Sequence, residues 1–117
     1  MEIREAQKRI DKWIKEVGGG YFSPLTNMAV LTEETGELAR IMARRFGDQR
    51  SKKGEDTSDE ALADELADVM RVVICLANQT GIDLDAAIER NINKIYTRDR
   101  DRFKTTDSNP DAESQRS

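Results

Sequence analysis

A chain of 117 residues is long enough for one domain with a modest core, and its apolar content (37%) barely exceeds its charged content (36%). The net charge of −4 argues against a nucleic-acid or membrane-surface partner, and the absence of histidine excludes every catalytic or metal-binding scheme that needs an imidazole. No stretch approaches the roughly 20 apolar residues of a membrane span, and the first residues are not signal-like, so we expect a cytoplasmic protein.

Two amphipathic helices are predicted in the first half of the chain. Apolar residues recur at three- and four-residue spacing from Met1 to Val17, and the three glycines at 18–20 end this helix. Ser23 is the expected N-cap of the second helix, and Pro24 is its first residue. This helix should end at Phe46, because a glycine follows.

A charged loop and a third helix come next. The loop, residues 47–56, contains no apolar residue and should be solvated. Thr57 and Glu60 match a capping box, which predicts that a helix starts there and continues to about Thr80. The single cysteine, Cys75, lies in an apolar run of this helix and is expected to be a buried free thiol.

A fourth helix should complete an all-α, bundle-like fold. Asp83 can cap it, and its apolar periodicity runs from Leu84 to about Arg98. No strand pattern bounded by hairpin turns is present. The expected organisation is therefore one helical domain, residues 1–103, followed by a disordered tail, residues 104–117.

Acidic pairs lie in the apolar stripes of two of these helices. Glu34 and Glu37 are three residues apart and so share one face of the second helix. Glu65 and Asp68 repeat the arrangement on the third helix. If the two helices pack face to face as an antiparallel hairpin, four carboxylates converge.

Divalent cations would resolve the conflict of four carboxylates in a low-dielectric site. A set of carboxylate oxygens suits Mg²⁺ or Mn²⁺ rather than zinc or copper. Two alternatives stay open: a solvated acidic face, or neutralisation by arginine and lysine partners. The second is weakened because Arg40, Arg44 and Arg71 are expected to project away from the two stripes.

These acidic residues, together with Glu33, resemble the EExxE…ExxD signature of the MazG-like nucleotide pyrophosphohydrolases. The first half of the signature is matched at residues 33–37, and the second at residues 65–68 after 27 intervening residues. The likeness extends over about residues 13–103 and is greatest to the short, single-domain YpjD-type members. The flanking "GELA" and a downstream segment rich in Lys and Arg strengthen it.

The resemblance implies an all-α NTP pyrophosphatase fold and Mg²⁺-dependent hydrolysis of a nucleoside triphosphate to the monophosphate and pyrophosphate. Its metal ligands would be Glu34, Glu37, Glu65 and Asp68. Glu33 and Glu34 are the candidate catalytic residues, and Glu33 could hold an additional metal ion or orient water. A related dUTPase-like activity is a further option, because that group shares the acidic motif.

The fourth helix offers candidate substrate-binding residues. Asn91, Lys94 and Arg98 border its apolar stripe and match the family's basic segment, which favours phosphate and sugar binding. The alternative is a solvated helix face with ordinary C-terminal cations. Lys52 and Lys53 could also reach phosphate, but a solvated loop is the better interpretation of that pair.

Three aromatic residues near the first helix could stack on a base. Trp13 lies in the helix's apolar stripe, so a place in the core is the preferred interpretation. Tyr21 and Phe22 fall between the glycines and the next helix, where they could form a pocket wall.

A nucleoside triphosphate pyrophosphohydrolase is the leading hypothesis, and a non-enzymatic acidic helical module that binds metal or a partner is the alternative. The third helix is apolar almost all round from Leu62 to Ala77, so other helices must cover every side of it. Three short helices can hardly do so. We therefore expect a homo-oligomer, either a dimer or a tetramer, with the substrate pocket near a subunit boundary.

Overall fold

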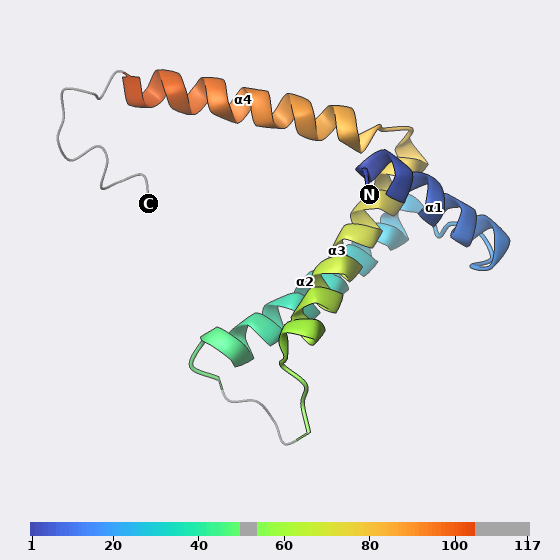
Figure 1. Ribbon diagram of the computed structural model, residues 1–117. Coiled ribbons are helices and arrows are strands. Elements are labelled where there is room, and N and C mark those ends of the chain that lie inside the picture. The colour runs from blue at the N-terminus through green and yellow to red at the C-terminus, as the bar shows by residue number, and fades with distance from the viewer. Residues whose placement is uncertain (50–53, 105–117) are drawn as a thin grey trace. The chain divides into compact units, whose positions relative to one another are not determined.

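The computed structural model describes residues 1–49 and 54–104, and this part of the chain contains four helices and no strand (Figure 1). The helices are α1 (Ile3–Glu16), α2 (Pro24–Phe46), α3 (Asp59–Thr80) and α4 (Leu84–Lys104). The predicted all-α fold is confirmed. None of the described helices is long and apolar enough to cross a membrane.

The chain divides into two compact units. The first, Met1–Asp83, contains α1, α2 and α3, and the second begins at Leu84 and contains α4. The predicted domain boundaries, 1–103 and 104–117, stay a prediction. The tail after residue 104 lies outside the described residues.

α2 begins and ends as its local sequence predicts. The Ser23 hydroxyl accepts a hydrogen bond from the Thr26 N–H at 3.2 Å, and Pro24 occupies the first turn, where its missing N–H leaves no bond unmade. A Cβ atom at Gly47 would lie only 2.8 Å from the Ala43 carbonyl oxygen. Glycine therefore suits the closely packed residue that follows this helix.

The start of α3 differs from the predicted capping box. Asp59 is the first helical residue, so Ser58 rather than Thr57 holds the N-cap position. The Ser58 hydroxyl accepts from the Ala61 N–H at 3.2 Å. The helix ends as predicted at Gly81, which adopts a left-handed backbone (φ 72°) that glycine enters without steric cost.

α4 is longer than the apolar periodicity suggested. It begins at Leu84 as predicted, but it continues past Arg98 to Lys104. The alternating Asp and Arg residues at its end have no apolar stripe. The helix continues through them because arginine is a good helix former, and an existing helix can be extended by a few residues without a buried face. Within this segment the Arg98 Nε lies 3.0 Å from an Asp99 carboxylate oxygen.

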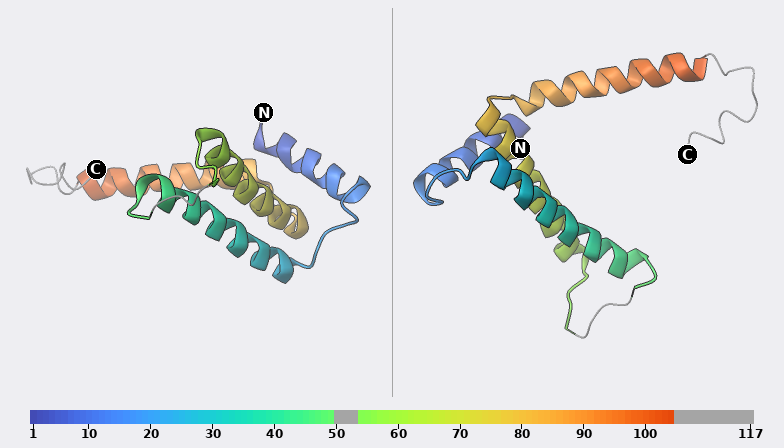
Figure 2. Two further views of the ribbon diagram at one scale, coloured as in Figure 1. Left: turned by 90° about the horizontal axis from the view of Figure 1, so that it is seen from below. Right: turned by 180° about the vertical axis from the view of Figure 1, so that it is seen from behind.

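In the first unit, α2 and α3 lie side by side as an antiparallel hairpin, and α1 packs on α3 (Figure 2). Six apolar side chains are buried among the residues whose burial is described, and four of them come from the second half of α3. The six are Ile14, Ile41, Val72, Ile74, Cys75 and Ala77. Cys75 is a buried free thiol, as expected. The prediction that Trp13 lies in the core is wrong, because this residue of α1 is 48% exposed.

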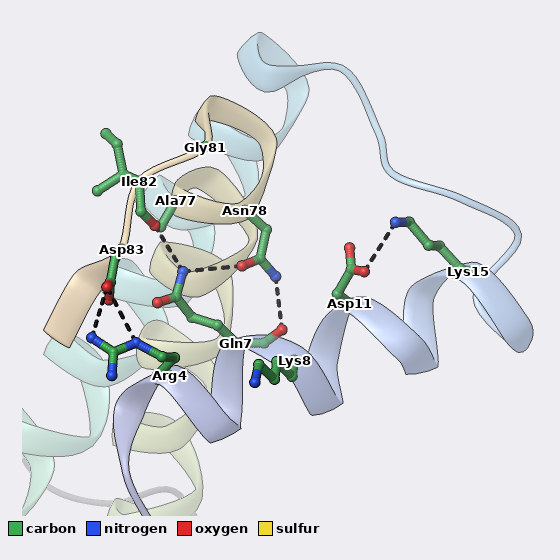
Figure 3. Close-up of a pocket in the computed structure, with 10 residues that line it drawn as sticks. All are labelled: Arg4, Gln7, Lys8, Asp11, Lys15, Ala77, Asn78, Gly81, Ile82 and Asp83. Carbon is green, nitrogen blue, oxygen red and sulfur yellow. Dashed lines mark hydrogen bonds and ion pairs between the residues drawn. The ribbon is translucent and has the colours of Figure 1, made fainter.

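A polar joint fixes α1 against the end of α3. Gln7, a buried residue of α1, donates through Nε2 to Asn78 Oδ1 (3.1 Å) and to the Ile82 carbonyl (2.9 Å), as Figure 3 shows. Asn78 Nδ2 donates in return to the Gln7 carbonyl (3.1 Å) and to Tyr21 Oη (3.0 Å). Each buried polar group in this joint thus has a partner. The joint holds the connection between α1 and α2 as well, because Tyr21 lies in it.

Candidate metal centre

The antiparallel packing of α2 and α3 brings three carboxylates together. Glu34 and Glu37 come from the middle of α2, and Glu65 comes from the first half of α3. Each offers one oxygen, and the three oxygens all lie within 4.8 Å of one another. The structure therefore places three of the four predicted ligands in one cluster, while their role as ligands stays a prediction.

Two oxygens of this cluster are buried without a partner. Glu34 and Glu65 are half-buried, and Glu37 is exposed. Oε2 of Glu34 and Oε2 of Glu65 are shielded from solvent, and neither accepts a hydrogen bond within the described residues. A buried acceptor without a donor is costly, so these two atoms mark the place where a cation would be most favourable.

Burial, and after it the crowding of like charges, sets the electrostatic state of the cluster. Burial raises the pKa of Glu34, and the nearby charges of Glu37 and Asp68 raise it further. Burial likewise raises the pKa of Glu65, followed by the charges of Glu37, Asp68 and Glu34. Like charges that share a poorly solvated site disfavour ionisation of one another.

Asp68 lies beside the three-carboxylate cluster and is paired with a cation. Arg71 Nη2 is 3.3 Å from Asp68 Oδ1. The Arg71 charge also offsets part of the increase in the pKa of Glu34. The expectation that Arg71 projects away from the acidic face is therefore wrong. Its three-residue spacing from Asp68 puts both side chains on one face of α3, which was the signal in the sequence that could have revealed it.

Two arginines at the C-terminal end of α2 pair with other carboxylates. Arg44 pairs with Glu55 (Nε–Oε1 3.3 Å) at the far end of α2, which agrees with the expected projection away from the stripe. Its neighbour Arg45 pairs with Asp59 at 2.7 Å. Of these three arginines, Arg71 is the one that pairs with a residue of the acidic site.

The donor set fits an oxygen-preferring divalent cation. Three glutamate oxygens within 4.8 Å of one another, with Asp68 next to them, offer only the hard ligands that Mg²⁺ and Mn²⁺ favour. A cation there would also give Oε2 of Glu34 and Oε2 of Glu65 a partner that the described residues do not supply.

The remaining site predictions fall elsewhere. Glu33 is exposed on α2 and is not one of the three clustered carboxylates. Asn91, Lys94 and Arg98 are exposed on α4, in the second unit, and their role in substrate binding stays a prediction. The two lysines of the loop, 52 and 53, lie outside the described residues.

The hydroxyl of Tyr21 is part of the polar joint between α1 and α3. Its hydroxyl donates to Asp11 Oδ1 at 2.6 Å and accepts from Asn78. Burial raises the pKa of Tyr21 to about 12, and the hydrogen bond to Asp11 adds to that increase. Phe22, the other predicted wall residue, is 64% exposed.

Comparison with known proteins assigns the chain and its fold to one class. Residues 22–103 match the model of the MazG nucleotide pyrophosphohydrolase domain. The uncharacterised protein YpjD of Bacillus subtilis (strain 168) is 44% identical over 101 residues, which span 86% of this chain and 89% of that protein. The chain therefore belongs to the MazG nucleotide pyrophosphohydrolase domain family.

Solved structures agree with this assignment. A crystal structure of YpjD from Bacillus subtilis superposes with a TM-score of 0.72 at 41% identity, covering 80% of this chain and 94% of that one. A Bacillus-conserved MazG protein, a nucleotide pyrophosphohydrolase, superposes with a TM-score of 0.68 at 39% identity and covers 81% and 90% of the two chains. The all-α architecture is thus that of the MazG class.

Proposed function

We propose that this protein is a metal-dependent nucleoside triphosphate pyrophosphohydrolase, which converts an NTP or dNTP to the monophosphate and pyrophosphate. The observation that carries the proposal is the meeting of Glu34, Glu37 and Glu65. Two of them, Glu34 and Glu65, have a buried oxygen that accepts no hydrogen bond from the described part of the chain. Membership of the MazG family supports the reaction class.

The reaction needs little beyond what carboxylates and bound cations offer. Water attacks the α-phosphorus, the bond from that phosphorus to the bridging oxygen breaks, and pyrophosphate leaves with the bridging oxygen. When bound, Mg²⁺ or Mn²⁺ neutralises phosphate charge and makes a coordinated water more acidic. Glu34, Glu37, Glu65 and Asp68 would hold the ions.

Proton transfer falls to a carboxylate, because the chain has no histidine. Glu33 and Glu34 are the candidates for accepting the proton of the attacking water. Glu34 is half-buried in the cluster, whereas Glu33 is exposed beside it on the same helix. A general base must lie within hydrogen-bond reach of the attacking water, so the carboxylates in and beside the cluster are the groups to test for this role.

A homo-oligomer, dimer or tetramer, is part of the proposal. Leu66 and Met70 of α3 are 49% and 45% exposed, although they belong to the most apolar helix of the chain. Apolar side chains on one face of a helix are commonly covered by a symmetric partner. α3 would then lie at the centre of the assembly.

A direct assay tests the proposed activity. Purified protein with Mg²⁺ or Mn²⁺ should release pyrophosphate from at least one nucleotide of an NTP and dNTP panel, and EDTA should abolish the release. Orthophosphate as the first product would place cleavage at another bond and contradict the assignment. Tight metal binding with no release from any nucleotide would favour the non-enzymatic binding module.

A further inference from the structure

An apolar pocket lies between α1 and α3, next to the acidic site. Its volume is about 580 Å³, and its lining residues are Met1, Ala6, Arg9, Ile10, Trp13 and Arg71. Four of these are apolar, and the other two are arginines. Small-molecule sites in proteins commonly have this size and composition, with an apolar wall and a few polar groups.

Arg71 joins this pocket to the acidic site. The same guanidinium that lines the pocket has its Nη2 atom 3.3 Å from Asp68 Oδ1. Its charge also acts on Glu34 of the carboxylate cluster. A molecule that fills the pocket is therefore separated from the predicted metal ligand Asp68 by the side chain of Arg71 alone.

Trp13 gives the pocket an aromatic wall. It projects from α1 at 48% exposure, although the periodicity of that helix predicts a core residue. An indole ring left partly open beside apolar neighbours is a stacking surface for a planar base. Arg9 and Arg71 provide positive charge in the same pocket, which suits an anionic ligand.

We propose that this pocket takes the nucleoside half of the triphosphate substrate, with the base stacked on Trp13 and Arg71 bonded to a phosphate oxygen. Asp68 would help to hold the cations of the acidic site, and Arg71, which lies 3.3 Å from Asp68, would donate to the substrate phosphate beside them. Trp13 and Arg71 are then substrate-binding residues. This proposal rests on the proposed function. It adds that the contact between the base and Trp13 determines which nucleotide is preferred.

The intrinsic fluorescence of the protein reads this contact directly, because Trp13 is its single tryptophan. A triphosphate with a methylene group between its α- and β-phosphorus atoms, which cannot be cleaved there, is titrated into wild-type protein with Mg²⁺. We expect saturable quenching by the nucleotide analogue. Inorganic tripolyphosphate, which lacks a base, should compete with the analogue and restore the fluorescence.

Variants supply the second readout. Trp13→Leu should raise the KM for the NTP roughly 5- to 150-fold, the range for loss of one base stack, with a much smaller change in kcat. Trp13→Phe should recover most of the affinity. Phe46→Leu, which removes another exposed aromatic ring at the far end of α2, should leave KM unchanged. Circular dichroism confirms that each variant is folded.

Arg71 is tested in the same way. Arg71→Gln should raise KM and weaken competition by tripolyphosphate, whereas Arg71→Lys should restore part of both. If Arg71 only pairs with Asp68 for structural reasons, Arg71→Gln would lower the stability of the protein without changing its affinity for tripolyphosphate. That result would overturn the assignment of Arg71.

The outcomes separate this proposal from the activity itself. Quenching of Trp13 by the analogue in a protein that releases no pyrophosphate would support the pocket and contradict the reaction. Normal turnover with an unchanged KM in Trp13→Leu and no quenching in wild type would support the reaction and overturn the pocket. A changed molecular mass in Trp13→Leu with an unchanged KM would show that a second copy covers the pocket, which also overturns the proposal.

Discussion

Arg71 Nη2 lies 3.3 Å from Asp68 Oδ1, three residues earlier on α3, and this guanidinium sits next to a cluster of three glutamates. One cation against four carboxylates leaves excess negative charge at the site. Glu34 and Glu65 are most affected, because their Oε2 atoms are buried and accept no hydrogen bond from any residue that the structure describes. The consequences for stability, metal binding and turnover follow from that imbalance.

Removing one charge should stabilise the metal-free protein. We expect Glu65→Gln to raise the melting temperature in EDTA, because it relieves repulsion with neighbouring carboxylates and can donate a hydrogen bond. In the wild type, Mg²⁺ at 100 times its Kd should add about 2.7 kcal/mol of stability, and in Glu65→Gln this gain should be largely lost. Thermal unfolding with and without Mg²⁺ measures both effects.

Glu60→Gln is the control for that experiment. Glu60 is exposed in the first turn of the same helix, and the N-cap bond there comes from Ser58. Its substitution should leave the response to Mg²⁺ unchanged. Equal metal responses in wild type and Glu65→Gln would remove Glu65 from the site.

Turnover should depend on both helices of the hairpin. Glu37→Gln on α2 and Asp68→Asn on α3 should each strongly reduce pyrophosphate release. The loss should exceed the roughly 10- to 100-fold that is typical when a residue hydrogen-bonded to a metal ligand is replaced. Both proteins should stay folded, because each change lowers the charge of a crowded site. Near-native activity in either variant would show that the carboxylates do not act together.

Acidic pH should stabilise the protein when metal is absent. Glu34 and Glu65 have a raised pKa in the folded state, so above the ordinary value of 4.5 the folded protein holds protons that the unfolded chain has lost. The free energy of unfolding should therefore fall as pH rises from 4.5 through the raised pKa values. Asp11 and Asp56 have a lowered pKa and act in the opposite sense, but below 3.8.

Melting curves in EDTA across this pH range test the effect. Glu34→Gln should flatten the pH dependence, and saturating Mg²⁺ should do so in the wild type. A melting temperature that rises steadily from pH 4.5 to 7 in metal-free wild type would refute the assigned cause.

The hydrogen bonds of the Tyr21 hydroxyl should stabilise the folded protein. Tyr21→Phe removes the 2.6 Å bond to Asp11 and the donor bond from Asn78, which should cost about 1–3 kcal/mol because Asn78 loses a partner in the joint. The pKa of about 12 also means that wild type loses this contribution only as pH rises from about 10 to 12. Urea unfolding measures the change, with Tyr96→Phe, an exposed tyrosine of α4, as control.

Self-association should bury the exposed residues of α3. Light scattering on dilute protein should give a mass that is a multiple of 13.3 kDa. Met70→Glu should shift that mass toward the monomer, because it places a charge in the expected interface. A stable and active wild-type species at the monomer mass would contradict the proposed assembly.

The sequence by itself was sufficient for most of the helical framework. Ser23 and Gly81 mark helix ends through local backbone chemistry, which depends only on neighbours along the chain. The pairing of Glu34 with Glu37 follows from helix periodicity in the same way. The family signature then indicated that the acidic pairs of two helices belong to one site.

Only the tertiary structure decided which groups meet across the helices. Periodicity assigns a residue to a face, but it does not say what covers that face or how far a long side chain turns along it. For that reason Trp13 was expected in the core and Arg71 away from the acids, yet Trp13 is half exposed and Arg71 contacts Asp68. The burial of single oxygens on Glu34 and Glu65 likewise arises in the packed pair of α2 and α3, which the periodicity of one helix does not describe.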